Sequence, residues 1–149
     1  MMADKPGKPY PYLNSEFNET SAKLSPDGKW LAYVSDESKR KEVYVVTFPK
    51  LGGKWSVSLN GGDLPVWSRD GKELYFIGAE KKMMAVEIKG GANFAAGSPK
   101  PLFDTHLGPN AWFDVSKDGR FLIPTAIEEQ GSAPTPFNVV VNWTAALKK

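Results

Sequence analysis

The chain contains no cysteine and a single histidine, His106, among its 149 residues. Without cysteine, neither a disulfide framework nor a thiolate metal site can form. A single histidine also excludes a metal site built from several histidines, and it leaves one imidazole as a general base. We therefore expect no metal ion and no other cofactor.

The sequence also lacks long apolar runs and an excess of either charge. No stretch approaches the roughly 20 apolar residues that span a bilayer, and the opening "MMADKPGKPYPY" lacks the apolar core of a signal peptide. The 19 basic and 17 acidic side chains leave a net charge of +2, which is too small to attract nucleic acid. Motifs of serine hydrolases, phosphate-binding loops and zinc proteases are absent as well. We expect neither membrane insertion nor nucleic-acid binding.

What the sequence does contain is a short pattern that occurs three times. It reads "SPDGKWLAYV", "SRDGKELYFI" and "SKDGRFLIPT", beginning at Ser25, Ser68 and Ser116. Each Ser-x-Asp-Gly predicts a type I turn, with glycine taking the positive φ that follows, between two strands of a hairpin. We therefore interpret these serines and aspartates as turn residues rather than as nucleophiles or cation ligands. The three glycines are 43 and 48 residues apart, a repeat length typical of propeller blades.

Short apolar runs, rich in β-branched and aromatic residues, predict four antiparallel strands in a complete copy. The expected fold class is all-β, with three β-propeller blades in a single domain. We assign blade 1 to residues 20–60, blade 2 to 61–106, and blade 3 to 107–149, where the outer strand is missing. Residues 9–14 predict an outer strand for a blade that is completed elsewhere. Large aromatic residues on these strands are expected in the core, namely Trp30, Tyr33, Trp67, Phe76 and Phe121.

Two segments carry a resemblance to a known family. "LSPDGKWLAYVSDES" followed by "EVYVVTFP", and "VWSRDGKELYFI" followed by "MMAVEI", resemble the blade repeats of TolB-like β-propellers. They are similar in particular to the propeller segments of bacterial transmembrane serine/threonine kinases, over about residues 9–147. The resemblance implies a module for protein interaction or ligand sensing, outside the cytoplasm, without catalytic residues. It differs in blade number, because relatives commonly carry six or more.

Candidate ligand-binding residues lie in the loops that join an outer strand to the next inner strand. In a propeller these loops surround one mouth of the central channel. They mix amides, carboxylates and aromatic rings, which suits a peptide or a small polar ligand. An alternative is a hydrolase or lyase in which His106 works with Asp63 or Glu19. The candidates are Asn18, Glu19, Asn60, Asp63, His106, Asn110 and Trp112.

Three blades are too few to close a ring, since known propellers close with about four to eight. An unclosed stack exposes a blade face at each end and an unpaired strand edge. We therefore predict a homodimer in which two chains form one six-bladed ring with two-fold symmetry. In that ring "PYLN", at 11–14, pairs with "FNVVVNW", at 137–143, of the other chain. A third interpretation is a purely structural half-propeller that serves as a building block for assembly.

Overall fold

The computed structural model describes residues 2–3, 9–89, 93–108, 110–124 and 137–140. In this part of the chain the regular structure is antiparallel β-strand, apart from one 3-10 turn at Ala79–Lys81. This establishes the expected all-β class. No helix within these ranges is long and apolar enough to cross a membrane.

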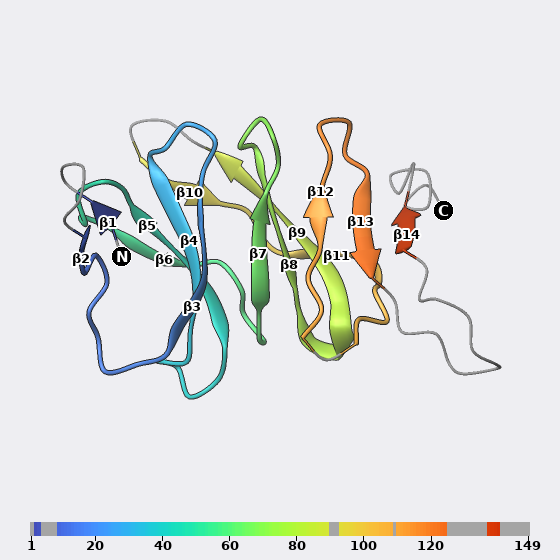
Figure 1. Ribbon diagram of the computed structural model, residues 1–149, viewed down its shortest axis with the longest axis horizontal. Coiled ribbons are helices and arrows are strands. Elements are labelled where there is room, and N and C mark those ends of the chain that lie inside the picture. The colour runs from blue at the N-terminus through green and yellow to red at the C-terminus, as the bar shows by residue number, and fades with distance from the viewer. Residues whose placement is uncertain (1, 4–8, 90–92, 109, 125–136, 141–149) are drawn as a thin grey trace.

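The strands form consecutive antiparallel sheets in chain order (Figure 1). The first sheet has the order β3-β4-β5-β6. In the second, β7, β8 and β9 follow one another, and both β10 and β11 pair with β9. The third has the order β12-β13-β14, and β1 and β2 form a separate pair. The bounds are β1 Met2–Ala3, β2 Pro9–Tyr10, β3 Glu19–Leu24, β4 Trp30–Ser35, β5 Glu42–Thr47, β6 Lys54–Ser56, β7 Asp63–Trp67, β8 Glu73–Ile77, β9 Lys82–Lys89, β10 Ala95–Ala96, β11 Lys100–Asp104, β12 Asp114–Val115, β13 Phe121–Pro124 and β14 Phe137–Val140.

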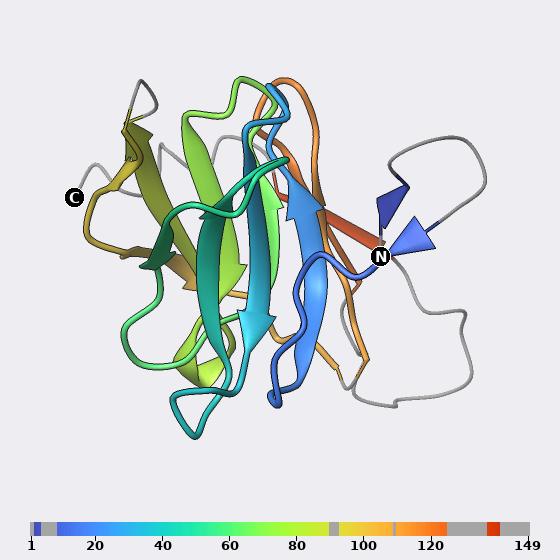
Figure 2. The same cartoon turned by 90° about the vertical axis from the view of Figure 1, so that its left-hand side faces the viewer.

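The core lies between successive sheets, which pack face to face. In Figure 2 the strands β3 to β6 of the first sheet face the viewer, with the other sheets behind them. One buried cluster, including Val34, Val45 and Phe76, joins the first sheet to the second, and another, including Tyr75 and Phe121, joins the second to the third. The five aromatic residues expected in the core are all less than 10% exposed. Successive meanders stacked in this way are the arrangement found in propeller blades.

The three Ser-x-Asp-Gly segments form turns at the same end of the molecule (Figure 1). In each one the glycine amide donates to the serine carbonyl, at 2.9 to 3.1 Å, as a type I turn requires. The three glycines have φ of 69°, 71° and 77°, in the left-handed region where a side chain is strained. In every copy the serine hydroxyl donates to the aspartate carboxylate. The predicted turn geometry is confirmed.

The third hairpin nevertheless pairs its strands differently from the first two. The amide of Ser25 donates to the carbonyl of Trp30, five residues later, and Ser68 likewise donates to Glu73. Ser116 instead donates to Arg120, four residues later. A shift of one residue moves every side chain of a strand to the opposite face. The strand β13 therefore turns toward the second sheet the side chains that the pattern of the first two hairpins would turn away, whereas Val115 on β12 faces the second sheet just as Trp67 on β7 faces the first.

The N-terminal segment lies against its own chain. The expected outer strand at 9–14 is not formed in the single chain, because β2 ends at Tyr10 and pairs with β1. Tyr12 and Leu13 instead pack on the outer face of the first sheet. That face is apolar, and no neighbouring sheet packs on it within the described residues, so the nearest apolar side chains cover it. Of the segment expected to receive residues 11–14, the structure describes only 137–140, and the remainder of 137–143 lies outside the described residues.

Candidate binding groove

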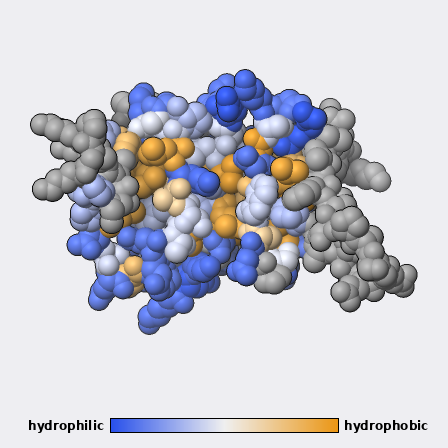
Figure 3. Space-filling view, viewed as in Figure 1, coloured by the Kyte–Doolittle hydropathy of each residue, from blue (hydrophilic) through white to orange (hydrophobic). Residues whose placement is uncertain are grey.

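A groove runs along β3, β7 and β12, the first strands of the three sheets. It has a volume of about 760 Å³, and its lining includes Lys23, Trp67, Arg69, Trp112 and Asp114. Figure 3 shows apolar surface across the middle of this face, with polar surface above and below it. We refer to this feature as the inner-strand groove.

Irregular backbone shapes two of the strands that border the groove. The pairing of β3 with β4 shifts between Thr20 and Lys23, and the pairing of β7 with β8 shifts between Asp63 and Val66. Each shift contains a residue with positive φ, Ser21 at 54° in β3 and Leu64 at 52° in β7. Such bulges bend a strand and increase its twist. They also protect an edge strand from pairing with other chains, so the edge remains available to line a groove.

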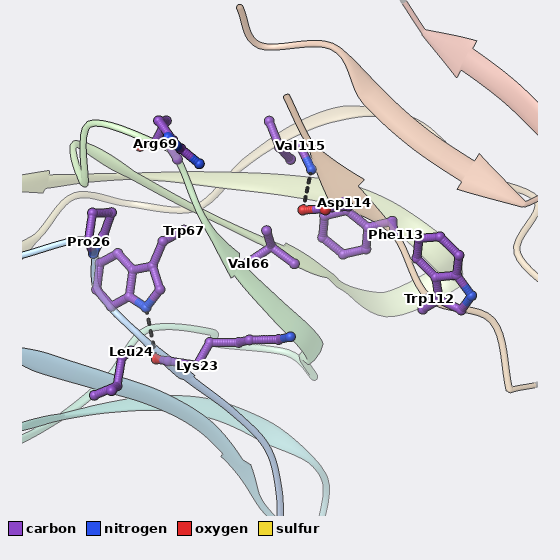
Figure 4. Close-up of a pocket in the computed structure, with 11 residues that line it drawn as sticks. Lys23, Leu24, Pro26, Val66, Trp67, Arg69, Trp112, Phe113, Asp114 and Val115 are labelled. Atoms are coloured by element: carbon purple, nitrogen blue, oxygen red, sulfur yellow. Dashed lines mark hydrogen bonds between the residues drawn. The ribbon is translucent and has the colours of Figure 1, made fainter. Parts of the chain in front are cut away.

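Trp67 forms the part of the groove wall that joins the first two sheets. Trp67 is only 8% exposed, and its indole Nε1 donates to the carbonyl of Lys23 at 3.0 Å (Figure 4). This bond ties β7 to β3 across the sheet boundary. This part of the wall is therefore built from strand residues.

The polar character of the groove comes from two cations and one carboxylate. Among the described residues, the side chains of Lys23 and Arg69 form no hydrogen bond or ion pair, and both residues are exposed. The carboxylate of Asp114 accepts from the amide of Val115 at 2.8 Å. Trp112 is 50% exposed beside the buried Phe113. The groove thus contains two unpaired positive charges and an accessible aromatic ring.

Of the seven residues predicted from the sequence, Trp112 lines this groove. Asn18 is bound to Asp36, through its amide Nδ2 at 2.6 Å and its backbone N at 3.0 Å. The other five are engaged or exposed elsewhere. Glu19 accepts from Ser15, Asp63 pairs with Lys41 at 2.8 Å, Asn60 borders a separate pocket, and His106 and Asn110 are exposed loop residues with φ of 51° and 57°.

Sequence reasoning missed Lys23, Trp67 and Arg69 as groove residues. Trp67 was expected only in the core, and the two cations resemble ordinary exposed charges. Their positions carried a usable signal, because they lie two residues before, one before and one after a turn serine. Lys23 and Trp67 belong to β3 and β7, the first strands of their sheets, and Arg69 belongs to the turn that follows β7.

A second polar cluster, around the buried carboxylate of Glu42, has a structural role. Glu42 is 3% exposed and accepts from the Ser58 hydroxyl, from the Gly61 amide at 2.9 Å and from Nε of Arg40 at 2.6 Å. A buried charge with this many partners is satisfied. It fixes the chain that leads from the first sheet into the second. No group of acidic or histidine side chains within the described ranges is arranged to hold a metal ion.

The stacked antiparallel meanders define an all-β protein with propeller-type architecture. No family model and no curated protein matches the sequence. Among solved structures the chain is similar to TolB from Acinetobacter baumannii, with 20% identity and a TM-score of 0.49, over 89% of this chain and 46% of that one. The chain thus spans about half the length of that protein. A likeness this distant carries no argument about function, so the assignment of the fold rests on the strand order of the chain itself.

Proposed function

We propose that the chain is a non-catalytic module for protein interaction or ligand sensing, and that its inner-strand groove holds an acidic peptide segment. The observation that carries this proposal is the presence of two unpaired cations, Lys23 and Arg69, in the same groove as the half-exposed ring of Trp112. Cations placed along a cleft attract negative groups, and aromatic rings are frequent anchors at protein interfaces. An acidic segment with an apolar or aromatic side chain complements both features.

The enzymatic alternative gains no support from the geometry around His106. In the described part of the chain, His106 forms no hydrogen bond or ion pair with either expected partner. Asp63 is paired with Lys41, and Glu19 is bonded to Ser15. A general base must lie within hydrogen-bond reach of the groups with which it works. We therefore prefer a binding role to a hydrolase or lyase.

A displayed library of random peptides tests the groove. We expect the unmodified chain to enrich acidic peptides that contain an aromatic residue, and the variant Lys23→Glu with Arg69→Glu to lose that enrichment. The control variant, Lys50→Glu with Lys89→Glu, makes the same charge change at exposed lysines that do not line the groove. Equal enrichment by both variants, or no preference for acidic peptides, would contradict the proposal.

We further propose that two copies associate, as three meanders leave an apolar face at the end of the stack. Leu31, Tyr33 and Val46 form that face on the first sheet. A six-bladed ring of two chains covers the face and falls within the blade numbers at which propellers close. Light scattering should give twice the chain mass of 16.4 kDa, and a monomer at every concentration would contradict the ring. The resemblance found in the sequence suggests a bacterial sensor segment outside the cytoplasm, associated with a kinase, as the setting for such a module.

A further inference from the structure

The outer face of the first sheet has the composition of a buried face. Leu31 and Tyr33 follow their turn serine by six and eight residues, as Leu74 and Phe76 do in the second sheet. Leu74 and Phe76 are 0% and 1% exposed, because they pack against the first sheet. The equivalent positions of the first sheet thus carry side chains suited to packing against another sheet. No other sheet of the described chain packs there.

Two side chains from the N-terminal segment occupy this face instead. Tyr12 and Leu13 pack against Tyr33, Tyr44 and Val46. The Tyr12 hydroxyl donates to the carbonyl of Thr47, and the Tyr12 ring centroid lies 5.3 Å from that of Phe48. Burial raises the pKa of the Tyr12 phenol, as expected for a ring that is partly removed from water. The contacts are specific, and they involve only two consecutive residues.

The cover is narrow and leaves apolar surface on both sides of it. A hollow of about 390 Å³ lies between Tyr12 and β3, and one of about 500 Å³ lies between Leu13 and the loop after β5. At the rims of these hollows Leu24, Phe17 and Leu51 are 47%, 40% and 58% exposed. A complete partner sheet would bury these side chains as well. It would therefore bury more apolar area on this face than Tyr12 and Leu13 do.

We infer that Tyr12 and Leu13 form a strap, which covers the outer face of the first sheet in the single chain and is displaced when a second copy packs there. The inference rests on the proposed association of two copies. In strand exchange the N-terminal segment would be part of the dimer and would favour it. A strap would have the opposite effect and would weaken association. Because strap and partner compete for one face, the apparent affinity between copies falls in proportion to the fraction of chains with an open strap.

The test combines the double variant Tyr12→Ser with Leu13→Ser, the milder Tyr12→Phe, and a control, Leu59→Ser. Leu59 is 64% exposed and lies outside the strap contacts. Binding of an apolar fluorescent dye, at concentrations where every variant is monomeric, reports whether the face is open. Sedimentation equilibrium over a concentration series gives the dimer Kd. We expect the double variant to bind more dye and to lower the dimer Kd about tenfold or more.

The results test the strap and the proposed dimer separately. Tyr12→Phe loses only the hydrogen bond from the hydroxyl to Thr47, so it should change dye binding and the dimer Kd in the same direction as the double variant, but less. Leu59→Ser should change neither. Unchanged dye binding in the double variant overturns the strap. A raised dimer Kd also overturns it, since Tyr12 and Leu13 would then belong to the interface. If the double variant binds more dye but stays monomeric at every concentration, Tyr12 and Leu13 do cover the face. A second copy then does not compete for it, and the proposed dimer is wrong.

Discussion

The first two Ser-x-Asp-Gly hairpins and the third have the same turn residues and similar turn geometry, but different strand registers. Trp30, Glu73 and Phe121 each follow their turn serine by five residues. Trp30 faces the next sheet, and Glu73 lies on the equivalent side, where its carboxylate accepts from the Tyr75 hydroxyl at 2.6 Å. Phe121 faces the preceding sheet and is completely buried.

The cause of this difference lies in packing rather than in the turn. Burying a phenylalanine contributes about 1.5 to 3 kcal/mol. In the third sheet the shifted register buries both Phe121 and Ile123 against the second sheet, where Tyr75 and Phe103 contact the Phe121 ring edge-on. The comparison shows that a repeated turn sequence specifies the turn, while the neighbouring sheet specifies the register.

The largest effect on stability is expected from truncating a side chain on the buried face of β13, compared with one on its opposite face. Phe121→Ala should cost about 3 to 5 kcal/mol of unfolding free energy, as a fully buried aromatic does. Leu122→Ala should cost about 1 kcal/mol, because Leu122 is only partly buried. Urea denaturation of the monomer measures both. If Leu122→Ala were the more damaging change, the third hairpin would have the register of the first two.

A comparison of the residues that precede the turn serine gives the second test. Trp67 is 8% exposed between the first and second sheets, whereas Leu24, its counterpart on the open side of the first sheet, is 47% exposed. Trp67→Ala should therefore cost about 3 to 5 kcal/mol. Leu24→Ala should stay within about 0.5 kcal/mol, as at other surface positions. Thermal denaturation of the monomer measures the two. A large loss from Leu24→Ala would mean that the open side of the first sheet is already covered.

Much of the local structure could be predicted from the sequence. The strands Trp30–Ser35 and Glu42–Thr47 coincide with β-branched and aromatic runs, and the turns follow from Asp-Gly chemistry, since both signals are local. The short strand Ala95–Ala96 could not be foreseen, because two alanines carry no strand signal. It forms beside Phe94, whose ring packs against Trp30 and Trp55.

The parts that could not be predicted depend on contacts between distant segments. The register of the third hairpin is one such case, and the position of Tyr12 on the first sheet is another, as each depends on which apolar face lacks a neighbour. For the candidate site, the loop position singled out Trp112, which lines the inner-strand groove. The sequence could not show that Asn18 and Asp63 would be bound by Asp36 and Lys41, because those pairings join residues 18 and 22 positions apart.

The smallest expected effect concerns the charges inside the turns. The serine hydroxyl lowers the pKa of the Asp27 carboxyl, assisted by the Lys29 amide. In the third turn the hydroxyl of Ser116 lowers the pKa of the Asp118 carboxyl, and the Arg120 guanidinium, 2.8 Å away, makes the second contribution. A carboxyl whose pKa is lowered by folding stabilises the fold above its unfolded pKa of about 3.9, and this contribution disappears as the pH falls through the lower folded value.

Asp27→Asn and Asp118→Asn should therefore each destabilise the chain slightly at pH 6 and make little difference near pH 2. Salt separates the two variants, because an exposed ion pair is screened at high ionic strength, whereas a bond to a backbone amide is affected less. Melting curves at pH 6, in low salt and in about 1 M salt, should show that the effect of Asp118→Asn shrinks more than that of Asp27→Asn. An equal response to salt would mean that the Arg120–Asp118 pair adds no more to the third turn than the longer Lys29–Asp27 pair, at 3.8 Å, adds to the first, and that these two turns are alike in their electrostatics although their registers differ.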